Sequence, residues 1–369
     1  MQSIITDQYP IHFNETAYTE LDLYLQKHNY SSVFILVDSN THTHCLPVFL
    51  SNVKGLSNVE IIEITPGEDH KTIETVTQIW LSLSELGADR KSLLLNLGGG
   101  VVTDMGGFIA STFKRGIDFI NIPTTLLSQV DASVGGKTGI DLEGMKNQIG
   151  TFAFPKMVLI DNHFLETLEK RELYSGFAEM LKHGLIANEN HWEKLSELDS
   201  ITIDSVKDLI GDSVEIKKEV TQADPTEKGL RKILNFGHTL GHAIESFYLE
   251  TPTNRLLHGE AIAIGMVCET YLSFKLNLIS KETLDDISRK ILKFYSLPKL
   301  NPENYEAILD WLKHDKKNAA QKINFSLIDK IGSCLKVSTT NTKQDGDEFT
   351  RSRGFHERKG DETSTKAHN

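Results

Sequence analysis

The chain has 369 residues, 39% of them hydrophobic, so it is long enough for two domains that each bury a core. Its formal net charge of -12 argues against a duplex nucleic-acid partner, because such proteins present an excess of Lys and Arg to phosphates. An anionic small molecule is compatible with this charge if a local pocket is basic. No apolar run approaches the roughly 18 residues of a membrane span, so we expect no membrane partner.

The cysteines Cys45, Cys268 and Cys334 are scattered, odd in number and without a CxxC pair. Such a pattern gives no disulfide framework and is typical of a reducing compartment. The first residues, MQSIITDQYPIHFNE, also lack the basic and apolar regions of a signal peptide. We therefore expect a cytoplasmic protein.

Up to about residue 160, short aliphatic or β-branched runs alternate with amphipathic stretches. The runs that read as buried strands are residues 31–38, 59–64, 92–97 and 117–123. Between the second and third runs, TIETVTQIWLSLSELG has apolar residues at helical spacing and ends in Gly87. This alternation predicts an α/β domain with a parallel sheet over residues 1–160.

A glycine-rich turn follows the third strand, which runs directly into GGGVVTDMGGFIAS. Gly98 to Gly100 would let the backbone approach a phosphate at a helix N-terminus. The motif is not GxGxxG, because Thr103 stands at the third glycine position, so a plain tight turn is the alternative. Asp38, at the end of the first strand, could accept hydrogen bonds from a ribose or cap a helix.

The segment after Pro123 is dense in polar residues and glycine. Its polar residues include Thr124, Thr125, Asp131, Ser133, Lys137, Lys146 and Asn147. A solvated loop is one interpretation. We expect instead a long ordered loop beside the cofactor turn, because such loops carry function more often than not.

From about Phe164 strands disappear and helical patterns dominate, which predicts an all-α second domain over residues 161–338. Residues 339–369 contain almost no aliphatic side chain, so we expect a disordered tail. One helical pattern contains FGHTLGH, in which His238 and His242 share a face one turn apart. The pair could hold a divalent metal or be a helix-packing pair.

Six blocks of sequence occur in order along the chain. They are GGGVVTDMGGFIASTFKRG, PTTLLSQVDASVGGKTGID, KNQIGTFAFP, GFAEMLKHG, GLRKILNFGHTLGHAIE and HGEAIAIGM. Over about residues 38–327 the chain resembles 3-dehydroquinate synthases of the shikimate pathway, within the sugar phosphate cyclase superfamily. The resemblance implies an NAD-binding α/β domain and an all-α domain that binds a divalent metal, zinc or cobalt, with the active site in the cleft between them.

The resemblance also implies the reaction. Members convert the anionic sugar phosphate 3-deoxy-D-arabino-heptulosonate 7-phosphate into 3-dehydroquinate and phosphate. The steps are transient oxidation by NAD, β-elimination of phosphate, re-reduction, ring opening and an intramolecular aldol closure, with the metal as a Lewis acid.

Matching the motifs residue by residue assigns roles that rest on the resemblance. Metal ligands fall on Glu179, His238 and His258. NAD contacts fall on Asp38, Glu68, Lys71, Gly99, Gly100, Val101, Asp104, Thr124, Thr125 and Ser128. Substrate contacts fall on Asp131, Lys137, Lys146, Asn147, Lys182, Lys217, Arg231, Asn235, His242 and one of Lys316 or Lys317. Five or six cations around a phosphate and a carboxylate make chemical sense.

Two single residues receive further roles, one from imidazole chemistry and one from the same matching. His242 is the candidate for proton relay, because an imidazole titrates near neutrality. Arg115, in FKRG, is expected to reach into a neighbouring subunit, so a homodimer is expected.

Three alternatives stay open at this point. A related cyclase would act on another sugar phosphate, and a metal-dependent polyol dehydrogenase would release NADH. A non-catalytic NAD-binding module would use its zinc structurally, although a structural site normally closes with a fourth protein ligand.

Overall fold

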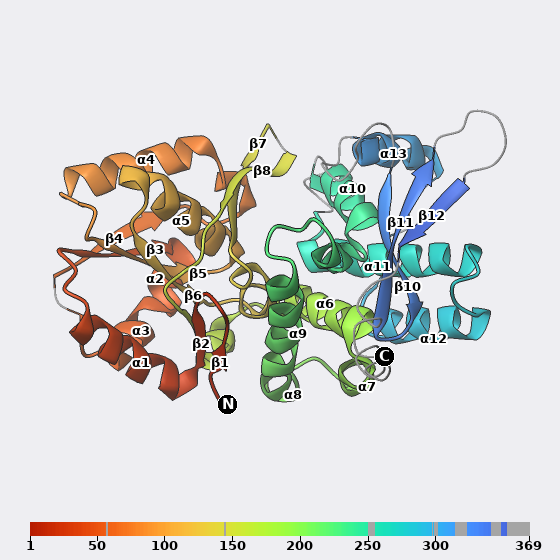
Figure 1. Cartoon of the computed structure of the whole chain (residues 1–369), viewed down its shortest axis with the longest axis horizontal. Coiled ribbons are helices and arrows are strands. Elements are labelled where there is room, and N and C mark those ends of the chain that lie inside the picture. The colour runs from red at the N-terminus through yellow and green to blue at the C-terminus, as the bar shows by residue number, and fades with distance from the viewer. Residues whose placement is uncertain are drawn as a thin grey trace, which may run out of the picture.

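The structure is a computed structural model that describes residues 1–56, 58–143, 145–249, 255–296, 298, 302–313, 323–340 and 348–352. Two lobes lie side by side along the long axis of the molecule, an α/β lobe from the first part of the chain and a mainly helical lobe from the second (Figure 1). Lys316 and Lys317 lie outside the described residues.

A seven-stranded sheet forms the centre of the first lobe, in the order β1-β2-β9-β6-β5-β3-β4. Its strands are β1 (Ile4–Ile5), β2 (Pro10–Phe13), β3 (Val33–Asp38), β4 (Val59–Ile64), β5 (Leu93–Gly98), β6 (Asp118–Pro123) and β9 (Val158–Ile160). All neighbours are parallel except the β1–β2 pair. The predicted α/β lobe with a parallel sheet is confirmed, and the four predicted strands are β3 to β6.

Helices cover both faces of this sheet (Figure 1). They are α1 (Asn14–Lys27), α2 (Ser39–His44), α3 (Leu46–Asn52), α4 (Ile73–Glu85) and α5 (Gly100–Thr112). On β3, Phe34 and Leu36 pack with α4 and α5, whereas Val33, Ile35 and Val37 pack with α1 and α3. The strand is apolar on both faces because helices cover both.

The polar segment after Pro123 is not the long loop that its composition predicts. It forms a short π-helical turn, η3 (Ser128–Ala132), and then a hairpin of β7 (Lys137–Leu142) and β8 (Met145–Phe152). Gly139 pairs with Gly150 in this hairpin. A Cβ on Gly150 would lie 2.3 Å from the carbonyl oxygen of Thr138, so the glycine that suggested a loop instead permits close strand pairing.

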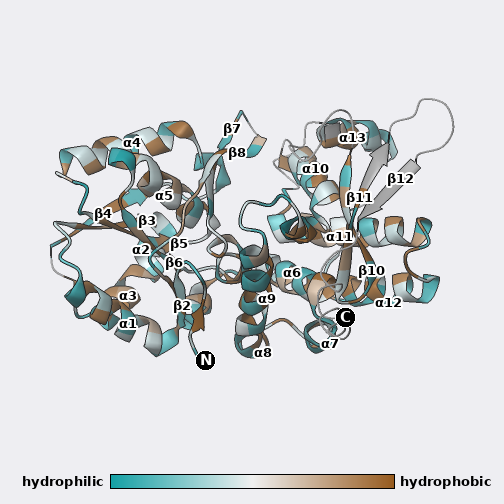
Figure 2. Ribbon diagram, in the orientation of Figure 1, coloured by the Kyte–Doolittle hydropathy of each residue, from teal (hydrophilic) through white to brown (hydrophobic). Residues whose placement is uncertain are grey.

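Helices dominate the second lobe, as expected. They are α6 (Lys170–Ala187), α7 (Glu189–Ser196), α8 (Ile203–Val206), α9 (Ile210–Ala223), α10 (His238–Leu249), α11 (His258–Lys275), α12 (Lys281–Leu292) and α13 (Tyr305–Lys313). Short 3-10 turns in the chain are η1 (Glu68–His70), η2 (Phe113–Arg115), η4 (Asn162–Thr167), η5 (Lys207–Leu209), η6 (Leu230–Asn235) and η8 (Pro302–Asn304). Figure 2 shows hydrophobic and hydrophilic residues alternating along these helices, as amphipathic helices require.

The prediction that strands disappear after Phe164 is wrong, because the helical lobe also carries a three-stranded antiparallel sheet. It consists of β10 (Asn324–Lys330), β11 (Ser333–Thr340) and β12 (Glu348–Ser352). Phe325 and Leu327 lie on one face of β10 and pack with Leu272 of α11 and with Leu276, which follows that helix. β12 lies in the segment predicted to be disordered, and residues 353–369 lie outside the described part of the chain.

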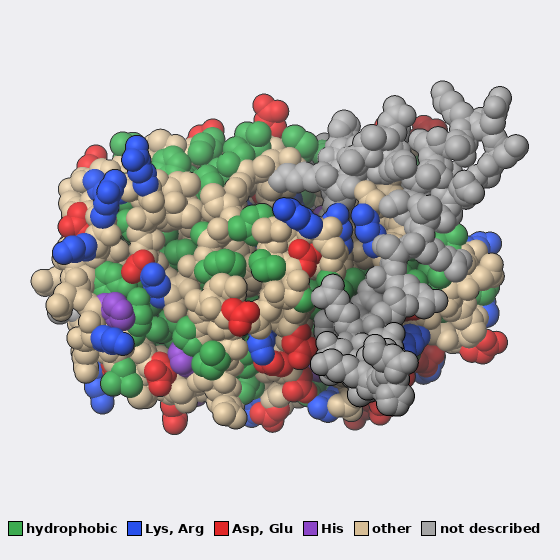
Figure 3. Space-filling model, viewed as in Figure 1, with side chains coloured by type: hydrophobic (Ala, Val, Ile, Leu, Met, Phe, Trp, Pro, Cys, Tyr) green, Lys and Arg blue, Asp and Glu red, His purple; other side chains and the backbone are tan. Residues whose placement is uncertain are grey.

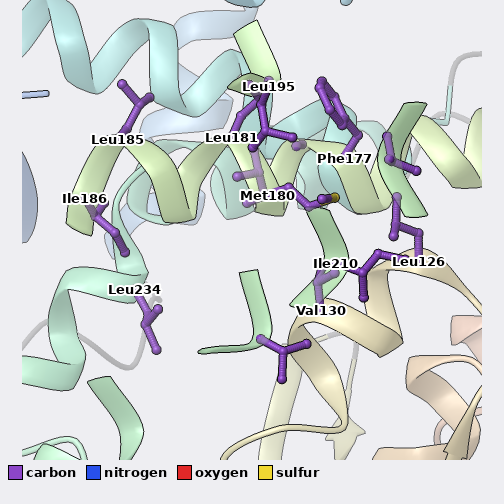
Figure 4. Packing of buried hydrophobic residues seen from close by; sticks show 14 of the residues in the cluster. Leu126, Val130, Phe177, Met180, Leu181, Leu185, Ile186, Leu195, Ile210 and Leu234 are labelled. Carbon is purple, nitrogen blue, oxygen red and sulfur yellow. The ribbon is translucent and has the colours of Figure 1, made fainter. Parts of the chain in front are cut away.

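One hydrophobic core is shared by the two lobes. Leu126 and Val130, which follow β6, pack with Phe177, Met180 and Leu181 of α6 (Figure 4). The approach is close, since a Cβ on Gly176 of α6 would lie 2.4 Å from a backbone nitrogen of the segment after β6. The shared core therefore joins the two lobes.

Among the described residues, no helix is long and apolar enough to cross a membrane. On the face shown in Figure 3, acidic and basic side chains are interspersed over the described surface. The net charge of -12 is therefore not gathered into one patch on that face.

Candidate active site

A cavity of about 1560 Å³ lies between the two lobes. It begins at the carboxyl ends of β3 and β5, where open α/β sheets bind ligands, and extends to α10 and α11. The predicted site residues that line it are Asp38, Glu68, Lys71, Gly99, Gly100, Val101, Asp104, Thr124, Thr125, Asp131, Lys137, Lys146, Asn147, Lys217, Arg231, Asn235, His242 and His258. Residues from distant parts of the sequence therefore converge on one cavity.

Five other predicted residues are not part of this lining. Four of them are buried: Ser128, Glu179, Lys182 and His238. Glu179, Lys182 and His238 contact other site residues through their side chains. Ser128 instead lies 3.2 Å from the hydroxyl of Thr103. Arg115 is exposed on η2.

The glycine turn forms the part of the cavity at the end of β5. Gly99 is the N-cap residue of α5 and has no side chain with which to cap the helix. It therefore does not occupy the first backbone N–H groups of α5, which a ligand could bind. A Cβ on Gly99 would lie 3.0 Å from the side chain of Thr125. This arrangement fits a phosphate at the helix N-terminus.

The helix-packing glycine of the turn is Gly106, three positions after Thr103. A Cβ on Gly106 would lie 2.0 Å from the Asn96 Oδ1 atom, so only glycine allows α5 to approach β5 this closely. The GxGxxG motif would place this glycine at position 103, whereas the second glycine pair of GGGVVTDMGG supplies it three residues later. The missing third glycine therefore does not argue against a dinucleotide site.

Asp38 performs the capping role that was one of its two predicted roles. Its Oδ1 atom accepts a hydrogen bond of 2.8 Å from the backbone N–H of Thr41. The Thr41 hydroxyl oxygen accepts a second hydrogen bond, of 2.9 Å, from the backbone N–H of Asp38. Asp38 also lines the cavity, so capping does not remove it from a ligand's reach.

Lys71 is a buried cation at the centre of the first lobe's side of the site. Its Nζ atom donates to Asp104 Oδ2 at 2.7 Å and Asn147 Oδ1 at 2.8 Å, and Glu68 lies 3.9 Å away. Burial opposes the charge, but Asp104 and Glu68 outweigh it and raise the pKa of Lys71. The ammonium group therefore stays charged and ties η1, α5 and β8 together.

Two imidazoles converge on one buried carboxylate in the second lobe. Glu179 is fully buried, and its Oε1 atom lies 3.5 Å from His238 Nε2 and 3.6 Å from His258 Nε2. The other ring nitrogens face acceptors, because His238 Nδ1 lies 3.1 Å from the Phe236 carbonyl and His258 Nδ1 lies 3.2 Å from Glu245 Oε2. Each Nδ1 must carry a proton to make these contacts, which directs both Nε2 atoms inward.

This arrangement fits a divalent metal. Two imidazole nitrogens and one carboxylate are a ligand set that suits zinc, and three protein ligands leave room for a substrate oxygen. His242 is an alternative ligand, since nitrogens of His238, His242 and His258 lie within 4.8 Å of one another. We favour Glu179 over His242, because a fully buried carboxylate needs neighbouring positive charge.

A cluster of opposite charges adjoins the Glu179 carboxylate. Lys182 Nζ contacts Glu179 Oε2 and lies 3.9 Å from Asp131 Oδ1, and Lys217 Nζ lies 2.7 Å from the same Asp131 atom. Burial opposes ionisation of Asp131, but Lys217 and Lys182 hold its pKa well below the usual range. Burial lowers the pKa of Lys217 to about 8, despite the neighbouring Asp131.

Arg231 has unused hydrogen-bonding capacity beside the cavity. It is 2% exposed, its Nη1 atom donates to the Pro225 carbonyl at 2.7 Å, and its Nε atom lacks a hydrogen-bond partner among the described residues. Lys137 contacts Glu227, whose Oε1 atom also accepts a 2.7 Å hydrogen bond from Asn235. A buried guanidinium with an unsatisfied N–H is suited to an anionic ligand.

Sequence reasoning missed several acidic partners of these cations, above all Glu245. The Glu245 carboxylate is 3% exposed and lies 2.6 Å from Lys146 Nζ and 3.2 Å from His258 Nδ1. The signal was present in HTLGHAIE, since Glu245 follows His242 by three positions on the same helix face. Glu227 gave no comparable signal.

Two family models match consecutive parts of the chain. Residues 61–175 match the model described as 3-dehydroquinate synthase N-terminal, and residues 176–318 match the model described as 3-dehydroquinate synthase C-terminal. The two models meet inside α6, whereas the sequence analysis placed the domain boundary at residue 160.

Related proteins agree with these models. A 3-dehydroquinate synthase of Parabacteroides distasonis is 42% identical over 328 residues, which cover 88% of this chain and 92% of the relative. Among solved structures, 2-deoxy-scyllo-inosose synthase complexed with carbaglucose-6-phosphate, NAD+ and Co2+ has a TM-score of 0.80 at 26% identity, covering 95% of this chain and 96% of that one.

A second solved structure also resembles this chain over most of its length. It is 2-epi-5-epi-valiolone synthase from Streptomyces hygroscopicus with NAD+ and Zn2+ bound, with a TM-score of 0.75 at 26% identity, covering 90% of this chain and 93% of that one. Both solved structures support the sugar phosphate cyclase fold with a helical second lobe. From the two family models, the curated relative and the cleft described above, the chain belongs to the 3-dehydroquinate synthase family.

Proposed function

We propose that the chain converts 3-deoxy-D-arabino-heptulosonate 7-phosphate into 3-dehydroquinate and phosphate, the reaction of its family. The observation that carries the proposal is the joining of three features in one cavity: a glycine turn, a metal-type ligand set and a cluster of buried cations. A plain dinucleotide-binding module would need only the first of them.

NAD would lie along the carboxyl ends of β3 and β5. The cavity-lining residues proposed to hold it are Asp38, Glu68, Lys71, Gly99, Gly100, Val101, Asp104, Thr124 and Thr125. NAD held there would supply reversible hydride transfer to and from the substrate. The chain contributes the backbone N–H groups of α5 and the Asp38 carboxylate, which orient the cofactor.

A divalent metal would be held by Glu179, His238 and His258. When bound, it would supply Lewis-acid polarisation of the hydroxyl oxygen on the substrate carbon that is oxidised. The histidine Nδ1 contacts with Phe236 and Glu245 keep both rings turned toward Glu179. These contacts pre-organise the ligand set before any metal arrives.

Cations on both sides of the cavity would bind the substrate's phosphate and carboxylate. The residues proposed for this role, with the polar groups beside them, are Asp131, Lys137, Lys146, Asn147, Lys182, Lys217, Arg231 and Asn235. Arg231 offers planar donors for bidentate contacts, and the lysines supply point charge as the phosphate leaves. The low dielectric of the buried site makes each cation count for more than it would on the surface.

Proton transfer is assigned to the groups that can change charge near neutral pH. A ring nitrogen of His242, which lines the cavity, would relay the proton, because imidazole exchanges protons readily in that range. Lys217 Nζ could also release a proton, because burial lowers the pKa of Lys217 to about 8.

A homodimer is also part of the proposal. Arg115 is exposed and outside the cavity lining, so it could act in catalysis only by reaching the site of a second copy. Light scattering on a purified sample would give the mass. A mixed dimer of Arg115→Ala subunits with active-site-inactivated subunits would then show whether activity needs Arg115 from the partner.

Phosphate release tests the proposed reaction directly. Purified protein with NAD and zinc should release phosphate from the heptulosonate phosphate without net accumulation of NADH, and a chelator should abolish the release. A phosphorylated sugar without a carboxylate serves as the comparison substrate, since it distinguishes a related cyclase. Growth of NADH absorbance with glycerol, and no phosphate release, would instead identify a polyol dehydrogenase.

A further inference from the structure

Glu245 connects two parts of the cavity that come from different lobes. It lies on α10, and its carboxylate is buried. One oxygen, Oε1, accepts from Lys146 Nζ at 2.6 Å, and Lys146 lies on β8 across the cleft. The other oxygen, Oε2, lies 3.2 Å from His258 Nδ1. One carboxylate thus bridges a proposed substrate cation and a proposed metal ligand.

We infer that Glu245 is a positioning residue that sets the orientation of the His258 ring for metal binding and the place of Lys146 for substrate binding. The inference rests on the proposed function. It adds a residue to the site that no motif match assigned.

The contacts of the His258 ring determine which of its two nitrogens is left to bind a metal. A carboxylate can only accept, so His258 Nδ1 must donate to Glu245. Nε2 then faces Glu179 Oε1, 3.6 Å away, and is the ring nitrogen left to bind a metal. His238 Nδ1 instead faces the backbone carbonyl of Phe236, at 3.1 Å. Substitution of Glu245 can therefore alter one metal ligand selectively.

The contacts of Lys146 indicate how Glu245 would affect substrate binding. Its ammonium group lies between Glu245 Oε1 at 2.6 Å and Glu68 Oε1 at 3.5 Å, one carboxylate from each lobe. Its side chain is 18% exposed and borders the cavity. The shorter contact is with Glu245, so the position of Lys146 depends mainly on the lobe that holds the metal ligands. Glu245 keeps the cation at a set place relative to His258.

A purely structural role would give different consequences. If Glu245 served only to neutralise Lys146 and join the lobes, removal of Lys146 would disturb the site as much as removal of Glu245. A second ion pair across the cleft, Asp69 with Arg255, allows a matched control. Its contacts are 2.8 and 3.1 Å, yet the Asp69 side chain is 68% exposed and does not touch the metal ligands.

The test measures metal affinity without requiring turnover. Zinc affinity is determined by competition with a coloured chelator for the wild type, Glu245→Gln, Lys146→Met and Asp69→Asn. We expect Glu245→Gln to weaken zinc binding about 10- to 100-fold, the usual range for loss of a carboxylate behind a histidine ligand. Lys146→Met and Asp69→Asn should keep zinc affinity within about threefold of the wild type.

Cobalt supplies a spectroscopic readout of ligand geometry. The visible absorption of the cobalt-loaded protein should change in Glu245→Gln and remain as in the wild type in Asp69→Asn, because only the former alters a ring that binds metal. Glu245→Asp keeps the buried charge and withdraws the carboxylate by one methylene. It should weaken zinc binding less than Glu245→Gln does, and it replaces that variant if Glu245→Gln does not fold.

Equal zinc affinity and equal cobalt spectra in the wild type and both Glu245 variants would overturn the inference. Loss of zinc in Lys146→Met to the same degree as in Glu245→Gln would also overturn it, since it would assign the effect to the ion pair between the lobes. Failure of the proposed function is separable. A wild type that binds zinc but releases no phosphate leaves the comparison of zinc affinities valid.

Discussion

Two histidines one turn apart on α10 have different surroundings. His238 is buried, and its Nε2 atom faces the Glu179 carboxylate, whereas His242 lines the open cavity. Their rings are 5.1 Å apart, so proximity alone does not separate their roles. The contacts of each ring separate their roles. A buried nitrogen beside a carboxylate suits metal binding, whereas a ring that lines the cavity suits proton transfer.

Alanine substitutions should separate these roles. His238→Ala should lose metal, with affinity reduced by more than about 100-fold, because a ligand itself is removed. His242→Ala should retain metal and lose about 100- to 10,000-fold in kcat. Metal content after desalting, measured beside phosphate release, checks both. Metal loss in His242→Ala would assign His242 to the ligand set instead.

A second residue-scale prediction concerns pH and stability. His191 is 1% exposed, and its Nε2 atom lies 2.7 Å from the Ser213 hydroxyl. Burial, with a smaller contribution from His183, lowers the pKa of His191 to about 4. The unfolded chain binds this proton near pH 6.5, so stability should fall as pH drops from about 6.5 to 4, by roughly 3 kcal/mol.

Urea unfolding at several pH values measures this dependence. His191→Gln keeps a polar side chain that cannot become charged, so its free energy of unfolding should decrease less over the same pH range. Parallel pH profiles for the variant and the wild type would mean that His191 does not carry the effect.

At the scale of elements, the β5–α5 unit depends on close approach of a helix to a strand. Gly106 of α5 faces the Asn96 side chain, which donates a 2.9 Å hydrogen bond to Asn121 on the neighbouring strand β6. Because the turn before α5 presents the proposed phosphate site, any shift of the helix also moves that site.

Gly106→Ala should destabilise the protein by about 1 to 3 kcal/mol, because its Cβ would lie 2.0 Å from Asn96 Oδ1 and must push the helix or break the side-chain contact. NAD affinity, measured by fluorescence titration, should fall with it. Gly211→Ala on α9 is the matched control. There the nearest atom is the flexible end of Met1, so the change should be neutral or stabilising by up to about 1 kcal/mol.

At the scale of the whole molecule, the shared core makes the two lobes interdependent. Leu126 and Val130 pack with α6, and residues of β2 and β9 belong to the same cluster. The cavity lies between lobes that this core joins. A ligand bound to either lobe should therefore stabilise both.

Calorimetry tests this cooperativity. The wild type should unfold in one transition, and either NAD or zinc alone should shift the whole transition upward, by about 2.7 kcal/mol in unfolding free energy at 100 times the dissociation constant. Leu126→Ala, a core truncation expected to cost about 2 to 5 kcal/mol, should lower that same transition. Two transitions, of which NAD shifts only one, would show that the lobes unfold separately.

The sequence by itself determined the strands β3 to β6, the helical second lobe, the glycine turn and the residue types of the site. These features depend on neighbours in the chain, since periodicity and turn residues encode them locally. Motif matching then pointed to the family, which the comparisons bear out.

Only the tertiary structure decided how these parts meet. The glycine-rich segment predicted to be a loop is a hairpin, and the helical lobe contains the unpredicted strands β10 to β12. The glycine that packs α5 against β5 is Gly106, whereas the motif placed it at position 103. The tertiary structure also brought Lys146 to Glu245, which lies 99 positions away in the chain. Such contacts are set by the packing of whole elements, and no pattern of adjacent residues encodes them.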